Sequence, residues 1–288
     1  MTGGPAALRA VTDDEIETFW RDGVVCLRQI LPVEVVAAMA DPIEELLDDS
    51  SMADLSAMAD ALEQAGATAL VDAKAPSTRG RFVAGTDHWV EHDAFRRFAV
   101  ESPIPSIVAQ VLRSRSVWLY EDSVLVKEPG TRERTGFHQD MAYFHLDGEN
   151  VCTTWVPLDT VDASTGAVRF VVGSHLDDTQ WRPNMFVADM QIPGTEGANV
   201  PDFDQVSGAT VISFDTVPGD LTIHHARTIH GAGANTSADR RRRAISVRYA
   251  GDGVVFRRRA GVPDKPHHAE LVDGEALTPP AFPVGRIA

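Results

Sequence analysis

The sequence has few cysteines and no apolar run long enough to span a membrane. Its two cysteines, Cys26 and Cys152, each lie in a short apolar run of the 288-residue chain, which favours buried, reduced thiols over a disulfide. The first residues do not combine a basic start with an apolar stretch, so we expect no secretory signal. These absences together favour a cytoplasmic location.

Positive charge is also scarce. The chain has 26 lysines and arginines against 42 acidic residues, and its formal net charge is −16. Binding of phosphate backbones needs a basic surface, so this charge argues against a nucleic-acid partner. The local exception is "RRRR", Arg240 to Arg243, which we expect to be mostly a solvated entrance to a strand. The expected partner is a small-molecule substrate, and the oligomeric state stays open.

Hydrophobic patterning divides the chain into a helical part and a β-rich part. Residues 12–49 predict helix, strand and helix, with Thr12 and Glu15 as a capping box and Pro42 dividing the second helix. From Val117 onward, short β-type runs alternate with turn signals, which is typical of an antiparallel sandwich or barrel. We therefore predict one domain over residues 1–288, with a helical part of about 12–115 outside a mainly β core of about 116–260.

The pattern His-x-Asp occurs three times in this sequence. On a strand, residues two apart project to the same face and can converge on one ion. His138 and Asp140 lie in "TGFHQDMAYF", a plausible strand. The pairs at 145/147 and 175/177 run into turn-like segments, so we interpret them as loop residues at the surface or at the rim of a site. Spacing alone leaves 138/140 open between a metal pair and a hydrogen-bonded core pair.

A third ligand would favour the metal interpretation. Two histidines and one carboxylate form the facial triad of non-heme Fe(II) oxygenases. The candidates are His224, His225 and His230. His230 ends a β-type run before a glycine-rich turn, whereas His224 and His225 are adjacent, so we expect one inside and one exposed. The downstream strand "RRAISVRY" also offers a permanently charged guanidinium for a dicarboxylate cosubstrate.

Three segments together resemble the phytanoyl-CoA dioxygenase family of Fe(II)- and 2-oxoglutarate-dependent oxygenases: "VLVKEPGTRERTGFHQDMAYF", "VCTTWVPLDTVDASTGAVRFVVGSH" and "GDLTIHHARTIHGAGANTSADRRRRAISVRYAGD". The resemblance implies a double-stranded β-helix, a cupin-like jelly roll, with flanking N-terminal α-helices. It also implies that His138, Asp140 and His230 bind iron. Counting from the distal histidine places the 2-oxoglutarate arginine at Arg241, whereas alignment of the strand places it at Arg242. We prefer Arg242, because turns absorb insertions and strands do not.

The resemblance assigns further residues to the cosubstrate site. Lys127 and Trp155 match positions that line this site in the family, although a solvent-facing lysine and a core tryptophan are the alternatives. Gln139 belongs to the ligand motif and either supports the ligands or contacts the cosubstrate. Ser246 shares a strand face with Arg242. We expect the segment "TRGRFVAGTDHWVEHDAF" at the mouth of the pocket.

The function that this resemblance implies is oxidation of an unactivated C–H bond with Fe(II) as the cofactor, in which 2-oxoglutarate and O2 are consumed and succinate and CO2 are released. Hydroxylation, or a related desaturation or ring closure, is the expected outcome. Because Asp140 supplies a carboxylate ligand, we do not expect halogenation. A small secondary metabolite or carboxylic acid is the expected substrate. The alternatives are a cupin-type isomerase or hydrolase that uses the same ligands without 2-oxoglutarate, and a non-catalytic jelly-roll binding protein.

Overall fold

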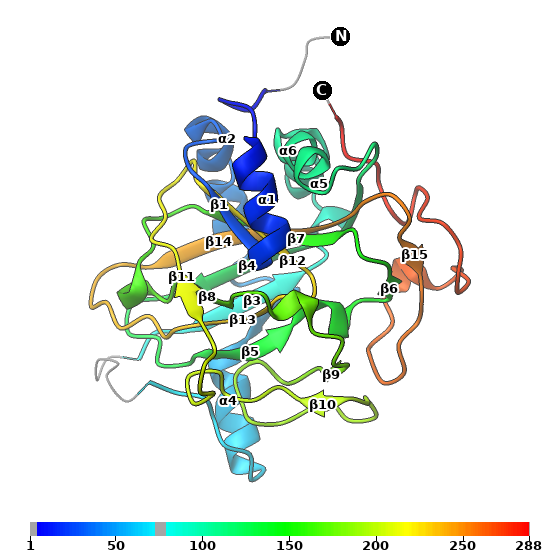
Figure 1. Ribbon diagram of the computed structural model, residues 1–288. Helices are drawn as coiled ribbons and strands as arrows, with labels where there is room; N and C mark the ends of the chain where they lie inside the picture. Colours follow the sequence, from blue (N-terminus) through cyan, green and yellow to red (C-terminus); the bar gives the residue numbers. More distant parts are fainter. Residues whose placement is uncertain (1–4, 73–78, 288) are drawn as a thin grey trace.

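A computed structural model describes residues 5–72 and 79–287, and two β-sheets form its centre (Figure 1). The larger sheet is antiparallel and has seven strands in the order β1-β12-β7-β14-β4-β3-β2. Its strands are β1 (Val24–Leu27), β2 (Met52–Asp54), β3 (Phe82–Thr86), β4 (Trp118–Lys127), β7 (Val151–Pro157), β12 (Leu221–His225) and β14 (Arg242–Ala250). The two longest strands, β4 and β14, pair with each other near the middle of this sheet.

The smaller sheet has four strands in the order β11-β8-β13-β5. These are β5 (Thr135–Gln139), β8 (Val168–Val171), β11 (Val211–Ser213) and β13 (Ile229–Ala232). Two short pairs lie outside both sheets: β6 (Leu146–Asp147) with β15 (Val255–Phe256), and β9 (Trp181–Arg182) with β10 (Ala198–Asn199). Antiparallel sheets with few helices confirm the predicted mainly β, jelly-roll fold class.

Helices cover the outer face of the larger sheet (Figure 1). They are α1 (Asp13–Asp22), α2 (Val33–Ala37), α3 (Ala40–Leu46), α5 (Asp93–Glu101) and α6 (Ile104–Val111), while α4 (Leu55–Gln64) lies at the opposite end of the molecule in Figure 1. Outward side chains of the sheet, such as Val124, Ile245 and Val247, join one apolar core with helical residues. Within the described part of the chain, no helix is long and apolar enough to cross a membrane.

The helical part of the chain has the helix signals that the sequence predicted, but its strands also join the larger sheet, which the sequence did not predict. The capping box of Thr12 and Glu15 is present. The second helix is divided as predicted, yet the break precedes Pro42, which falls in the first turn of α3 where a missing N–H costs no hydrogen bond. Three strands from this part, β1, β2 and β3, extend the larger sheet. Cys26 and Cys152 are both free thiols.

The inner face of the larger sheet carries the polar residues. Along β14, Arg242, Ser246 and Arg248 alternate with the outward Ile245 and Val247. Side chains on a strand point alternately to its two faces. One set of β14 side chains therefore faces the cavity, and the other set faces the apolar core. The smaller sheet packs over this inner face, and the candidate site lies between the two sheets.

Gly231, next to His230 in β13, lies against the backbone of the neighbouring chain segment. A Cβ atom at this position would lie 2.7 Å from the carbonyl oxygen of Thr135 and 3.3 Å from the carbonyl carbon of Gly136. We predict that Gly231→Ala separates β13 from β5 and lowers the free energy of unfolding by about 1–3 kcal/mol. Urea denaturation measures this loss.

The matched control is Gly233→Ala, because a Cβ atom there would meet Gly166 Cα at an ordinary 3.6 Å. We expect this variant to change the free energy of unfolding by less than about 0.5 kcal/mol. Equal destabilisation by both substitutions would contradict the close backbone approach at Gly231.

Candidate active site

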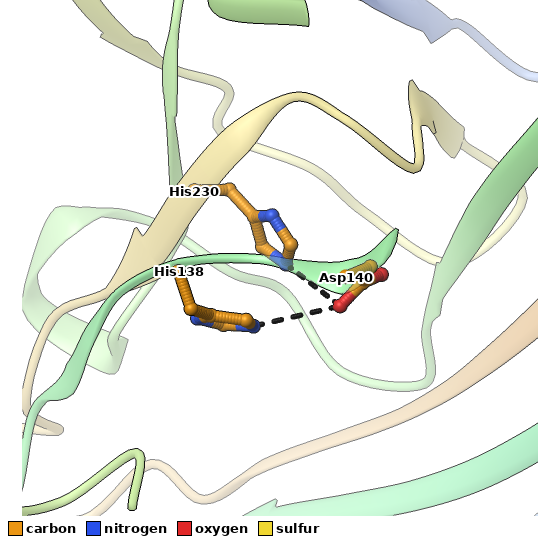
Figure 2. Close-up of side chains that lie close together, drawn as sticks. All are labelled: His138, Asp140 and His230. Carbon is orange, nitrogen blue, oxygen red and sulfur yellow. Dashed lines mark ion pairs between the residues drawn. The ribbon is translucent and has the colours of Figure 1, made fainter. Parts of the chain in front are cut away.

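Two histidines and one aspartate converge between the sheets (Figure 2). His138 and His230 are directly opposite each other in the pairing of β5 with β13. Their Nε2 atoms lie 3.5 and 3.6 Å from Oδ1 of Asp140. One ligand atom from each residue lies within 4.8 Å of the other two, and all three residues are buried. This donor set, two imidazoles and one carboxylate, is suited to a divalent transition metal.

Asp140 does not lie on the predicted strand. Strand β5 ends at Gln139, and Asp140 is the first residue of a short 3-10 helix, η2 (Asp140–Tyr143). The chain leaves the sheet here because the pairing with β13 reaches only as far as Gln139 opposite Ile229. The turn still directs the Asp140 carboxylate toward His138, so the two side chains converge although strand periodicity ends between them.

Backbone carbonyl groups orient both imidazole rings. Nδ1 of His138 lies 2.9 Å from the carbonyl oxygen of Gly136, and Nδ1 of His230 lies 3.0 Å from that of Thr228. A carbonyl oxygen can only accept, so in each ring Nδ1 carries the hydrogen and Nε2 offers its lone pair. Burial lowers the pKa of His230 well below its usual range, which keeps this ring neutral. Both rings are therefore prepared to coordinate through Nε2.

The carboxylate of Asp140 presents one oxygen to the two histidines and the other to the larger sheet. Oδ2 accepts a hydrogen bond of 2.5 Å from Thr153 Oγ1 and lies 3.4 Å from His224 Nε2. Burial raises the pKa of this carboxyl, but the surrounding histidines, His230 first, outweigh that effect and hold the pKa well below its usual range. The residue is thus ionised, with Oδ1 left for a metal.

The neighbouring histidines His224 and His225 point to opposite sides of β12, as expected, but neither is exposed. His224 is 2% exposed, lines the cavity beside Asp140, and neither of its ring nitrogens has a hydrogen-bond partner among the residues described. His225 is 1% exposed and hydrogen-bonds through Nε2 to the carbonyl oxygen of Glu149 at 2.6 Å. The expectation of an exposed residue was wrong because α1 and its neighbours cover the outer side of β12.

The other two His-x-Asp pairs are separated by burial. Asp147 and Asp177 are exposed, in agreement with a surface position. His145 and His175 are instead buried, which corrects the interpretation of these histidines as surface residues. Nε2 of His145 lies 3.1 Å from the carbonyl oxygen of Pro263, and that of His175 lies 3.1 Å from that of Trp20. Each ring therefore anchors a loop to another part of the chain.

The triad lines a cavity of about 430 Å³ between the sheets. Three of the residues expected at the cosubstrate site, Arg242, Trp155 and Ser246, line the same cavity. Ser246 donates a hydrogen bond to the carbonyl oxygen of Thr154, and the Arg242 guanidinium lies 5.7 Å from the centre of the Trp155 ring. The polar and aromatic lining therefore extends from the triad to Arg242.

Arg242 is a buried cation with no carboxylate of the described residues within ion-pair distance. It is 1% exposed, its Nε has no hydrogen-bond partner, and no ion pair joins it to a carboxylate within residues 5–72 and 79–287. Burial lowers its pKa to about 10, which still leaves it charged at neutral pH. Arg241 points outside instead and pairs with Glu44 at 2.6 Å and Glu128 at 2.7 Å. An unpaired buried guanidinium is costly, so the cavity is suited to an anion beside Arg242.

Two expected cosubstrate residues lie outside this cavity's lining. Lys127 is directly opposite Arg242 on β4, but its amine donates to the carbonyl oxygens of Glu133 at 2.9 Å and Gly233 at 2.6 Å. Burial and the charge of Arg242 hold its pKa well below the usual range. Gln139 points to the other side of β5, donates to the Arg227 carbonyl oxygen at 2.8 Å, and lines a different cavity. Strand alternation explains this, because its neighbour His138 faces the site.

Part of the segment that was expected at the pocket mouth lines the cavity. Phe82, Ala84, Gly85 and Thr86 of β3 line the cavity, together with Leu55 from α4. Thr78, the first residue of the expected segment, lies outside the described residues. Sequence reasoning missed Glu121, Ser123 and Phe186, which also line the cavity. Alternation along β4 was the available signal for the first two, while Phe186 lies in an irregular segment that offers none.

The chain is similar to a known protein family and to several solved structures. A model of the phytanoyl-CoA dioxygenase (PhyH) family matches residues 19–244. The non-heme alpha-ketoglutarate-dependent carbocyclase SnoK from nogalamycin biosynthesis is 24% identical, with 99% of this chain and 100% of SnoK covered and a TM-score of 0.70. The epimerase SnoN of the same biosynthesis is also 24% identical, with 95% of this chain and 98% of SnoN covered and a TM-score of 0.69.

Two further relatives share less of the chain or less identity. EctD from S. alaskensis, solved with 2-oxoglutarate and 5-hydroxyectoine, is 16% identical, with 86% of this chain and 79% of EctD covered and a TM-score of 0.58. A probable alpha-ketoglutarate-dependent hypophosphite dioxygenase from Stutzerimonas stutzeri is 29% identical over 107 residues, which span 37% of this chain and 36% of that enzyme.

The cofactors named with these relatives agree with those expected from the sequence. One SnoN structure is a complex with Fe3+, alpha ketoglutarate and nogalamycin RO. At these identities, the likeness to solved structures establishes the jelly-roll fold. The family match spans most of the chain, from residue 19 to residue 244, and the protein therefore belongs to the phytanoyl-CoA dioxygenase family, as its motifs predicted.

Proposed function

We propose that this protein is an Fe(II)- and 2-oxoglutarate-dependent dioxygenase that hydroxylates an unactivated C–H bond of a small organic molecule. The observation that carries the proposal is the presence, in one cavity, of a two-histidine, one-carboxylate group and a buried guanidinium without a carboxylate partner in the described chain. A metal ion would bind the two histidines and the carboxylate, and the distal carboxylate of 2-oxoglutarate would pair with the buried guanidinium.

The residues present fit the metal on chemical grounds. His138 and His230 each direct an Nε2 lone pair toward the centre because a carbonyl group binds the hydrogen on Nδ1. Asp140 contributes Oδ1, since Thr153 holds Oδ2. One charged and two neutral ligands, with further positions open, are the set that non-heme Fe(II) oxygenases use. Iron supplies the oxidising chemistry when bound, with O2 and 2-oxoglutarate consumed and succinate and CO2 released.

The protein's own contribution is positioning and exclusion of water. Arg242 holds the distal carboxylate in a bidentate, permanently charged fork, and Trp155 packs beside this guanidinium. Apolar side chains from β3, α4 and β4 close the remaining walls. Of the solved structures that share this fold, SnoN is an epimerase and SnoK is a carbocyclase. The reaction catalysed on this fold therefore varies from protein to protein, and for this chain we propose C–H oxidation with hydroxylation as its outcome.

The alternative of a cupin-type isomerase or hydrolase accounts for the three ligands but not for Arg242. Such chemistry has no dicarboxylate to bind, so it leaves a buried positive charge uncompensated in the cavity. A non-catalytic jelly-roll protein leaves both features without a role. Iron-dependent binding of 2-oxoglutarate separates the proposed function from both alternatives.

Removal of one metal ligand tests the triad. We predict that in His138→Ala the Fe(II)-dependent conversion of 2-oxoglutarate to succinate falls by more than the roughly 100-fold that loss of an outer-shell partner can cost. Succinate is quantified with and without added Fe(II). The matched control is His145→Gln, which alters the neighbouring His-x-Asp pair outside the cavity and should retain iron-dependent turnover. Turnover that persists unchanged in His138→Ala would exclude the triad.

Paired arginine variants test the cosubstrate site. We predict that Arg242→Met raises the dissociation constant of 2-oxoglutarate by about 30-fold or more, which corresponds to about 2 kcal/mol, because the carboxylate loses its buried partner. Arg241→Met should leave this constant unchanged, since Arg241 pairs with Glu44 and Glu128 at the surface. Titration calorimetry of the anaerobic iron-loaded protein gives both values. A larger effect at Arg241 would reverse the assignment.

A third pair of variants tests the support of the carboxylate ligand. Thr153 donates to Asp140, whereas the adjacent Thr154 points away and donates to the Val247 carbonyl oxygen at 3.0 Å. We predict that Thr153→Val weakens Fe(II) binding by about 10- to 100-fold, because Oδ2 loses its donor. Thr154→Val should affect stability and not iron affinity. Equal iron affinities in the two variants would show that Thr153 does not orient the ligand.

A further inference from the structure

A second arginine lines the cavity at some distance along the strand from Arg242. Arg248 of β14 lies directly opposite Glu121 of β4, and both side chains reach the cavity. Nη1 of Arg248 donates to Ser123 Oγ at 2.5 Å and lies 3.3 Å from Glu121 Oε1. Its Nε is buried and has no hydrogen-bond partner in the described part of the chain. The guanidinium is thus held in place with donor capacity left over.

This pair belongs to a balanced group of four charges. Lys265 Nζ lies 2.5 Å from Glu121 Oε2 and 2.5 Å from Asp87 Oδ2. Burial, followed by the negative charge of Glu121, raises the pKa of Asp87 to about 6, which still leaves it mostly ionised at neutral pH. Two cations therefore face two carboxylates. The nearby Asp122 lies on the opposite face of β4, where it accepts from the backbone N–H of Trp89.

The rest of the cavity also reaches balance under the proposed function. Arg242 and a divalent metal ion supply three positive charges, and Asp140 and 2-oxoglutarate supply three negative ones. No charge then remains in the cavity for a substrate to neutralise. Burial of an unpaired charge in such a site is costly, so a charged substrate is disfavoured whichever its sign.

The other residues that line the cavity indicate the polarity of the rest of the substrate. Apolar side chains from both sheets and from the segments beside them make up most of the wall: Leu55, Phe82, Ala84, Leu125, Val168 and Phe186. Near Arg248, the wall offers a guanidinium donor together with the oxygen atoms of Glu121 and Ser123. A hydroxyl group can both donate to and accept from such a set.

We propose that the substrate is an uncharged, mainly apolar molecule with a hydroxyl group that accepts a hydrogen bond from Arg248 and donates one to Glu121. The inference rests on the proposed function, because 2-oxoglutarate is what balances Arg242. It assigns substrate recognition to the pair on β14 and β4 and excludes carboxylates, phosphate esters and amines as preferred substrates. Of the two substrate classes expected from the sequence, the proposal favours a small secondary metabolite over a carboxylic acid.

Three probes with one apolar skeleton test the charge preference: para-isopropylbenzyl alcohol, para-isopropylbenzoate and para-isopropylbenzylamine. Each is titrated calorimetrically into anaerobic protein loaded with Fe(II) and 2-oxoglutarate. We expect the alcohol to bind at least about tenfold more tightly than either ion, a difference of about 1.4 kcal/mol. Tighter binding of an ion, or no binding of any probe, overturns the proposal. The preceding 2-oxoglutarate titration of the same sample tests the proposed function separately.

Charge variants then test whether this pair sets the preference. Glu121→Gln leaves one positive charge in excess, so the benzoate should become the tightest probe, and Arg248→Gln should favour the amine. The double variant with both substitutions is balanced again and should restore the preference for the alcohol, which separates charge from damage to the fold. Asp204→Asn, which removes the ion-pair partner of Arg169 outside this cavity, serves as the control. An unaltered ranking in the folded single variants contradicts the assignment.

Discussion

Arg242 is buried at the inner face of the larger sheet without a carboxylate partner in the described chain, and this uncompensated charge constrains what the cavity can do. A protein tolerates such a group only where a ligand or a compensating function repays its desolvation. The nearby Lys127 cannot balance the charge of Arg242, because a lysine side chain carries no negative charge and its amine binds backbone carbonyl groups. The anion must come from outside the chain, and the triad in the same cavity indicates which anion.

Much of this site could be predicted from sequence, because its main features are periodic or local. Alternating short strands indicated an antiparallel sandwich or barrel, and the resemblance to a known family specified the jelly roll. Strand alternation also placed Arg242 and Ser246 on one face of β14. A third ligand downstream distinguished His138 and Asp140 from the other His-x-Asp pairs. Sequence context could not decide whether His145 and His175 are buried, because their partners, Pro263 and Trp20, lie more than a hundred residues away.

Two kinds of feature could not be read from the sequence: the direction of single side chains, and the pairing of segments that lie far apart in the chain. Gln139 belongs to the ligand motif, yet it faces another cavity because it neighbours His138 on a strand. Asp140 reaches the centre from a 3-10 turn and not from the predicted strand. The contribution of β1, β2 and β3 to the larger sheet depends on long-range pairing, which local patterns do not contain. The charge-balanced group around Arg248 also joins segments far apart in sequence, from Asp87 to Lys265.

We infer that the triad and Arg242 together bind a metal ion and 2-oxoglutarate. A crystal of the protein grown anaerobically with Mn(II) in place of iron, and with 2-oxoglutarate, tests this by anomalous scattering. We expect an anomalous peak bounded by Nε2 of His138, Oδ1 of Asp140 and Nε2 of His230, with the distal carboxylate of 2-oxoglutarate on Arg242. A peak elsewhere, or a cosubstrate bound away from Arg242, would contradict it.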